Sequence, residues 1–113
     1  MASKARTRQR VVRGSTNVFA DLGYPDADER QTKLRLAHAI NTTIGEQGLT
    51  QLPAAHRLGV SQPKISALAN YQLDGFSVER LMTFLTALDQ DVDIVIRRKP
   101  RSRSAARISV VAA

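Results

Sequence analysis

The side chains that could perform catalysis or bind a metal are few in this chain of 113 residues. It contains no Cys and only two histidines, His38 and His56. The absence of Cys excludes disulfides, thiolate metal sites and cysteine nucleophiles, and two imidazoles are too few for a three-histidine zinc site. Neither histidine is accompanied by the carboxylate and serine of a catalytic site, and both are predicted to lie at the surface or at the boundary of the core. The sequence therefore predicts a binding protein rather than an enzyme, with no cofactor and no metal ion.

The basic residues lie mostly at the two ends of the chain. Met1–Arg13 has five Lys/Arg and Arg97–Arg107 has six, and neither segment contains an acid. The stretch between them, Gly14–Ile96, has the other six Lys/Arg and all ten Asp/Glu, which leaves a net charge of −4. Blocks of like charge are typical of tails that contact nucleic acid. We expect a basic flexible arm over 1–13, a folded domain over 14–98, and a basic tail over 99–113 that can be disordered.

The folded part is expected to be one small domain. With 42% apolar residues the chain can build a core, and its length is too short for two domains of ordinary size. No segment approaches the roughly 20 apolar residues of a membrane span. The charged N-terminus is not followed by the apolar run of a secretory signal peptide. We therefore expect a cytoplasmic protein.

The first half of the central stretch predicts a loop and a long helix. Gly14–Tyr24 contains several helix-breaking residues and is predicted to be a docked loop. A helix is expected from about Ala27 to Gln47, with Asp26 as N-cap, Glu29 in the capping-box position and Gly48 as the C-cap glycine. Its apolar side chains recur at helical spacing, which predicts a buried face formed by Leu36, Ala37, Ile40 and Ile44.

Two short helices are predicted in the middle of the chain. Thr50 caps the first, Gln51–Leu58, and Ser61 caps the second, which runs to about Asn70. Each has a proline in its first turn, where the missing N–H removes no helical hydrogen bond. Gly59 lies in the very short connection, where it can adopt a conformation that other residues resist. Two short helices joined by a tight turn containing Gly form a helix-turn-helix.

The end of the central stretch predicts one more helix and a strand. Ser77 caps a helix from Val78 to Leu88 that has a continuous apolar stripe. Val92–Arg97 is β-branched and partly alternating, which favours a strand. A lone strand cannot satisfy its backbone groups, so its partner is either Ile108–Val111 or the same strand of a second copy. The expected fold is all-α, with four to five helices and one short C-terminal β-strand paired across a dimer.

Residues Leu49–Leu68 resemble the helix-turn-helix of the lambda-repressor and Cro-like group, the XRE family. The matching residues are Leu49, Thr50, Gln51, Ala55, Leu58, Gly59, Val60, Ser61, Gln62, Ile65 and Ser66. Three further segments, Asn17–Ala27, Gly75–Leu81 and Asp91–Arg97, are similar to HigA-type antitoxins. The resemblance implies a dimeric, sequence-specific transcriptional repressor of its own operon. It also implies the antitoxin of a type II pair that neutralises a RelE/HigB-like toxin.

The resemblance further implies how the protein would bind operator DNA. Gln51 would contact a backbone phosphate and Gln62 a base edge, since an amide matches the donor and acceptor of adenine. Lys64 could donate to guanine or a phosphate, and Ser61 lies where a helix start suits a phosphate. The expected DNA-binding residues are Gln51, Ser61, Gln62, Lys64, Ser66 and Ala67. Auxiliary phosphate contacts are expected from Arg10, Arg13, Arg57 and Arg98.

Two other functions fit the same sequence. One is a general or phage-type repressor without a toxin partner. The other is an interaction or RNA-binding protein in which the basic arms hold nucleic acid and the motif is only a scaffold. The net charge of −4 over Gly14–Ile96 favours the latter. The basic segments at the two ends could also be tails whose only role is to keep the protein soluble.

Overall fold

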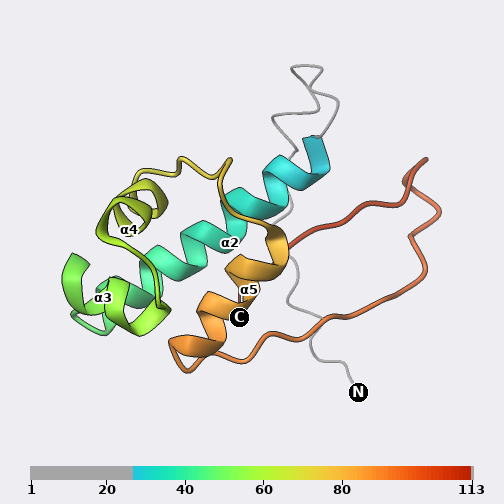
Figure 1. The fold of residues 1–113 in the computed structure, drawn as a ribbon. Coiled ribbons are helices and arrows are strands. Elements are labelled where there is room, and N and C mark those ends of the chain that lie inside the picture. The colour runs from blue at the N-terminus through green and yellow to red at the C-terminus, as the bar shows by residue number, and fades with distance from the viewer. Residues whose placement is uncertain (1–26, 113) are drawn as a thin grey trace.

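Four helices form the structured core of residues 27–112, the part of the chain that the computed structural model describes. They are α2 (Ala27–Glu46), α3 (Gln51–Leu58), α4 (Gln62–Ala69) and α5 (Val78–Ala87). Figure 1 shows α3 and α4 beside one end of the long α2, with α5 packed against α2. All four predicted helices are confirmed, each within one residue of its expected ends. The loop predicted over 14–24, the Asp26 cap and the arm over 1–13 lie outside the described residues.

The core lies where α2, α4 and α5 meet. Its largest fully buried side chains come from all three helices and from the residue after α5, namely Ile40, Leu68, Leu81, Phe84 and Leu88. Phe76, from the loop before α5, packs edge to face against Phe84 with ring centroids 5.9 Å apart. This geometry places the positive edge of one ring against the negative face of the other. The loop between α4 and α5 is thereby joined to the core.

The apolar stripe predicted for α2 faces this core. Leu36, Ala37 and Ile40 are buried, and Ile44 packs against them at the edge. One turn apart on α2, Lys33 and Glu29 form an i,i+4 ion pair at 3.4 Å. Gly48, two residues beyond the end of the helix, has a φ of 68°, which agrees with its predicted role as the C-cap glycine.

The C-terminal segment differs from the prediction. No strand forms over 92–97, nor elsewhere in residues 27–112. A strand needs a second strand to pair with its N–H and C=O groups, and the described residues supply none. In particular, residues 108–111 make no backbone hydrogen bond with residues 92–97. Val92 and Val110 pack against the core, and the chain between them runs out as a long loop (Figure 1). Pairing with a second copy stays a prediction.

Candidate nucleic-acid interface

The turn between α3 and α4 is set by Gly59. This residue has φ 69° and ψ 35°, in the left-handed region that disfavours residues with a Cβ. The reversal lets the Val60 N–H donate to the Ala55 carbonyl at 3.0 Å, which satisfies a carbonyl at the end of α3. The chain then enters α4 after only two more residues. The predicted helix-turn-helix is therefore present in the structure.

The start of α4 is exposed and well capped. The Ser61 Oγ accepts a hydrogen bond from the Lys64 N–H at 3.3 Å, and Pro63 lies in the first turn. These features fix where the helix begins without covering it. Gln62 lies in this first turn with an exposed side chain, and Gln51 is exposed at the start of α3.

Buried contacts hold α4 from its other face. Ile65 and Leu68 are buried in the core, with Leu68 fully so. The Asn41 side chain of α2 donates a hydrogen bond to the Leu68 carbonyl at 3.1 Å. Ser66 and Ala67, both expected to bind DNA, are half-buried, and Ala67 packs against the core. The first three residues of α4, Gln62–Lys64, are therefore its longest exposed stretch, and Ala69 is exposed at the other end.

Lys64, an expected DNA contact, is exposed, but its ammonium group is bound within the protein. Its Nζ donates to the Gly75 carbonyl at 2.9 Å and lies 4.5 Å from the centre of the Phe76 ring. Both contacts are favourable for a cation. Lys64 therefore ties α4 to the loop before α5, a contact that the spacing of residues along the sequence did not predict.

Arg57 has a similar structural contact. Its Nε donates to the Ala87 carbonyl at 3.1 Å, and its Nη2 forms an ion pair with Asp89 at 3.3 Å. The guanidinium thus lies at the C-terminal end of α5, where a helix favours positive charge. A phosphate bound by Arg57, as predicted, would have to use the same guanidinium group that already contacts Ala87 and Asp89.

Comparison with known proteins gives the family. A family model described as a helix-turn-helix domain matches residues 18–97. A solved structure named as an XRE family transcriptional regulator is 73% identical, with a TM-score of 0.75. The match covers 79% of this chain and 100% of that one. The chain belongs to the XRE family of helix-turn-helix transcriptional regulators. No curated protein matches it.

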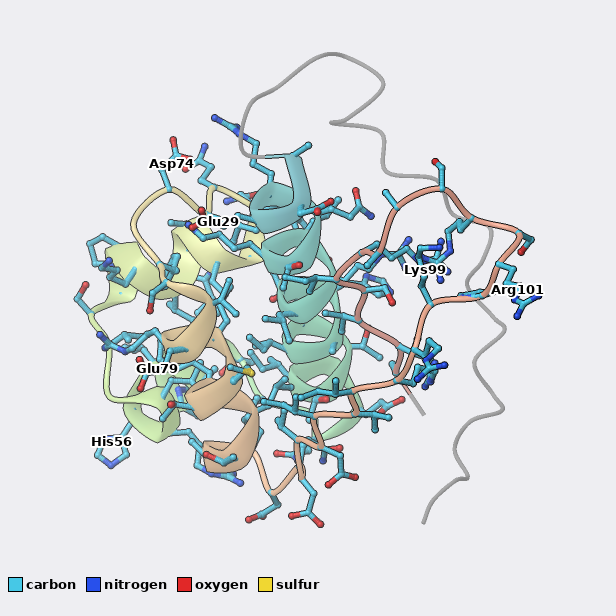
Figure 2. All side chains as sticks on the ribbon, turned by 90° about the vertical axis from the view of Figure 1, so that its right-hand side faces the viewer. Glu29, His56, Asp74, Glu79, Lys99 and Arg101 are labelled. Carbon is cyan, nitrogen blue, oxygen red and sulfur yellow. The ribbon has the colours of Figure 1, made fainter. Side chains whose placement is uncertain are left out.

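The C-terminal basic residues of this XRE-family protein lie away from α3 and α4. Figure 2 shows Lys99 and Arg101 on one side of α2 and His56 of α3 on the other. Figure 1 gives the same separation in the perpendicular view. Arg98 is exposed in this C-terminal segment, whereas Arg10 and Arg13 lie outside the described residues. A phosphate contact by Arg98 would therefore involve a different stretch of DNA from the one at α4 of the same chain.

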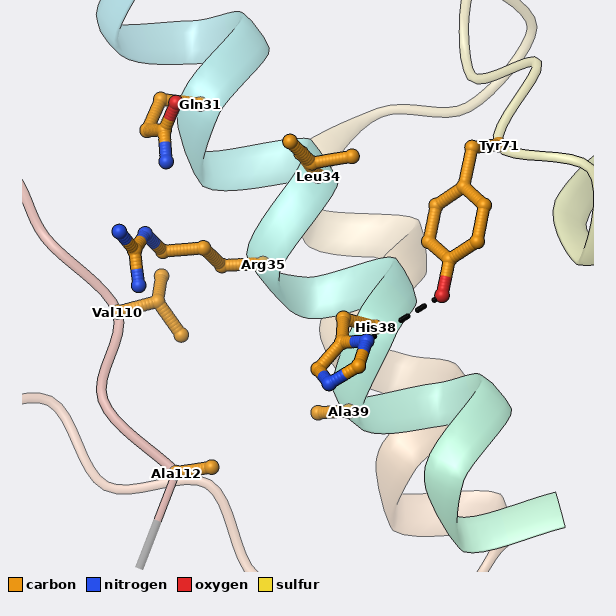
Figure 3. A pocket seen from close by; sticks show the side chains of 8 residues that line it. All are labelled: Gln31, Leu34, Arg35, His38, Ala39, Tyr71, Val110 and Ala112. Carbon is orange, nitrogen blue, oxygen red and sulfur yellow. Dashed lines mark hydrogen bonds between the residues drawn. The ribbon is translucent and has the colours of Figure 1, made fainter. Parts of the chain in front are cut away.

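A hollow of about 420 Å³ lies between α2 and the end of the chain (Figure 3). The His38 Nδ1 and Tyr71 hydroxyl are 3.3 Å apart at its edge, and Val110 and Ala112 line the opposite side. Both His38 and His56 are exposed, as predicted. Over residues 27–112, no group of three His or acidic residues could hold a metal ion, and no helix is long and apolar enough to cross a membrane.

Proposed function

We propose that this XRE-family regulator is a cytoplasmic, non-enzymatic repressor that binds its own operator as a homodimer. The observation that carries the proposal is the exposed start of α4, where Gln62 lies on a helix fixed by the buried Leu68. A helix held in this way can insert its N-terminal end into the major groove. Its two copies in a dimer would read two half-sites about 34–36 Å apart.

The exposed residues have different proposed roles. Gln62 hydrogen-bonds to a base edge, because its amide can both donate and accept. Gln51 and Ser61 contact phosphates, which sets the position of α4 on the duplex. Lys64 acts indirectly, because its ammonium already donates to the Gly75 carbonyl. It keeps the loop before α5 in place beside the recognition helix.

Operator binding by point variants tests these roles. DNA from directly upstream of the gene and a shuffled control are titrated by fluorescence anisotropy at about 150 mM salt. The native protein should prefer the operator by about a thousandfold or more. Gln62→Ala should lower operator affinity by about 5- to 150-fold and leave the shuffled DNA unaffected, since it removes only base contacts. Gln51→Ala should weaken binding to both DNAs alike, since phosphate contacts carry no sequence information.

Gln90→Ala is the matched control, because it removes the same exposed side chain from a position beyond α5. Its operator preference should equal that of the native protein. An unchanged preference in Gln62→Ala would reject the assignment of the recognition face. Weak and equal binding of the native protein to both DNAs, lost on removal of the two basic ends, would favour the alternative in which the arms hold nucleic acid.

We further propose that the protein is the antitoxin of a type II pair with a RelE/HigB-like toxin. The support is the similarity of Asn17–Ala27, Gly75–Leu81 and Asp91–Arg97 to HigA-type antitoxins. These segments lie outside the α3–turn–α4 motif, so this proposal is separate from that of DNA binding.

Expression of the adjacent small reading frame tests the antitoxin proposal. Its product should arrest growth when expressed alone, and co-expression with this chain should restore growth and give a complex that copurifies. A neighbouring product that is harmless alone, with operator binding intact, would favour a general or phage-type repressor instead.

A further inference from the structure

Within the described chain, the segment from Asp91 to Lys99 contains the longest run of exposed large apolar side chains. Ile94, Val95 and Ile96 are 74%, 62% and 92% exposed. Backbone groups over 91–99 make no hydrogen bond to one another or to other described residues. A β-branched run in this state is a template for strand pairing. Figure 1 shows it leaving α5 with no strand alongside.

The two faces that this segment would have as a strand differ in character. Val92 is half-buried against the core, so in an extended chain Ile94, Ile96 and, at the far end, Arg98 lie on the same side as Val92. The opposite side carries alternate residues that are charged except at the centre, namely Asp91, Asp93, Val95, Arg97 and Lys99. One face is therefore suited to extend the core and the other to face water.

The charges are arranged symmetrically and with opposite sign about Val95. Asp93 and Arg97 lie two residues on either side of it, and Asp91 and Lys99 lie four residues on either side. In an antiparallel pair of two copies centred on Val95, Asp93 of each copy faces Arg97 of the other. Asp91 then faces Lys99 in the same way. The symmetry therefore creates four cross-strand ion pairs, a favourable arrangement in a sheet.

Other pairings lose this match. Parallel pairing in register would place each acid opposite itself. A slip of one residue would put the apolar face of one copy beside the charged face of the other. Slips of two residues would place Val95 opposite either Arg97 or Asp93. The uncharged residues 108–111 offer no complement to the charges of 91–99. The sequence of this segment thus fits a second copy of itself.

We propose that residues 91–99 form an antiparallel intermolecular strand pair centred on Val95, and that this pair is the dimer interface. The inference deepens the proposed function, because it names the surface that makes the proposed homodimer. In each copy Ile94 lies beside Ile96 of the other, so each isoleucine gains an apolar cross-strand neighbour that a single chain does not provide. Of the basic residues that follow, Arg97 then lies nearest to the two-fold axis, two residues along the strand from Val95.

Cysteine cross-linking tests the register directly, because the chain contains no other thiol. Directly opposed residues in an antiparallel pair have Cα atoms about 4.5–5.5 Å apart, within the range for a disulfide. Val95→Cys should therefore form a covalent dimer rapidly under mild oxidation. Lys99→Cys is the matched control, because its two copies would lie about 27 Å apart. A mixture of Asp91→Cys and Lys99→Cys chains should give a covalent heterodimer.

Charge exchange tests the pairing without introducing a thiol. Asp93→Arg should raise the dimer dissociation constant about tenfold or more, since two ion pairs become repulsive contacts. The double variant Asp93→Arg/Arg97→Asp keeps the net charge and should restore the native constant. Sedimentation equilibrium measures both, and circular dichroism confirms that the helices are unchanged in each variant.

Several outcomes would overturn the inference. The native chain could be monomeric at every concentration tested. Val95→Cys could form its disulfide no faster than Lys99→Cys. The double variant Asp93→Arg/Arg97→Asp could fail to restore the native dimer dissociation constant. Efficient and specific linking at position 95 in a protein with no operator preference would reject the proposed function while leaving the strand pair intact. If the native protein is a dimer but Val95→Cys forms no disulfide between chains, the strand pair is rejected. The proposal of operator binding would not be affected by that result.

Discussion

The helix-turn-helix over 51–69 and the C-terminal segment over 91–112 carry equally clear sequence patterns but reach different states. In the first, the apolar residues Leu58, Ile65 and Leu68 are all buried within one chain. In the second, Ile94 and Ile96 stay exposed. Both regions have the apolar spacing of their predicted element. The helices formed and the strand did not.

The difference lies in where each element finds its hydrogen bonds. A helix pairs its N–H groups with carbonyls four residues earlier, so α4 is complete once its ends are capped. A strand pairs with groups outside itself, so residues 92–97 need a partner before they can form one. The sequence pattern of one segment can therefore predict whether that segment forms a helix. It can predict a strand only if the segment that pairs with it is also known.

The helix-turn-helix and the C-terminal segment are expected to differ most in how much a truncated apolar side chain lowers the free energy of unfolding. Leu68→Ala should lower the free energy of unfolding by about 2–5 kcal/mol, because the side chain is fully buried. Ile96→Ala should change it by less than about 0.5 kcal/mol in dilute, monomeric protein, because the side chain is 92% exposed. Urea unfolding followed by circular dichroism measures both. Similar losses in the two variants would show that Ile96 is buried in the isolated chain.

A smaller effect tests whether the turn of the motif depends on local backbone conformation. Gly59→Ala should cost about 1–2 kcal/mol, because φ is 69° and only the backbone resists the new Cβ, which would meet no atom within 4 Å. Gly45→Ala is the matched control in α2, where the Cβ also meets nothing within 4 Å and φ is not positive. It should stabilise the protein by about 0.5–1 kcal/mol. A Gly59→Ala variant as stable as the native protein would contradict a role for the left-handed turn.

Much of the fold could be predicted from the sequence because its helix ends are locally encoded. Ser61 and Ser77 each accept a hydrogen bond from the N–H three residues later, and Gly48 and Gly59 each have a positive φ. These signals act within a few residues, so spacing alone locates the helices. The strand could not be settled in the same way, because its partner is not a neighbour in the sequence.

The candidate site could be predicted only in part, for a related reason. The exposed positions of Gln51 and Gln62 agree with the pattern of the motif. The contacts of Lys64 do not follow from it, because its acceptor is the carbonyl of Gly75, eleven residues away. Arg57 likewise donates to Ala87, thirty residues away. Backbone carbonyls at such distances have no signature in residue type, so neither contact could be predicted from the sequence.

The smallest expected effect concerns whether Arg57 serves the motif, the fold or both. Arg57→Gln removes both the hydrogen bond to Ala87 and the ion pair with Asp89, and it should lower the free energy of unfolding by about 1–1.5 kcal/mol. Asp89→Asn removes only the exposed ion pair and suits the positive φ of this position, so it should cost less, about 0.2–1 kcal/mol. Urea unfolding separates the two variants.

Operator binding at several salt concentrations decides the second role. If Arg57 contacts a phosphate, Arg57→Gln should reduce the slope of log affinity against log salt by about one. Asp89→Asn should leave that slope unchanged and raise affinity slightly, since it removes a negative charge while the Nε–H of Arg57 can still donate to Ala87. A slope that is the same in the native protein and Arg57→Gln would assign Arg57 to the fold alone. Arg57 would then resemble Lys64, a cation of the motif whose charge is used to hold two elements of one chain together.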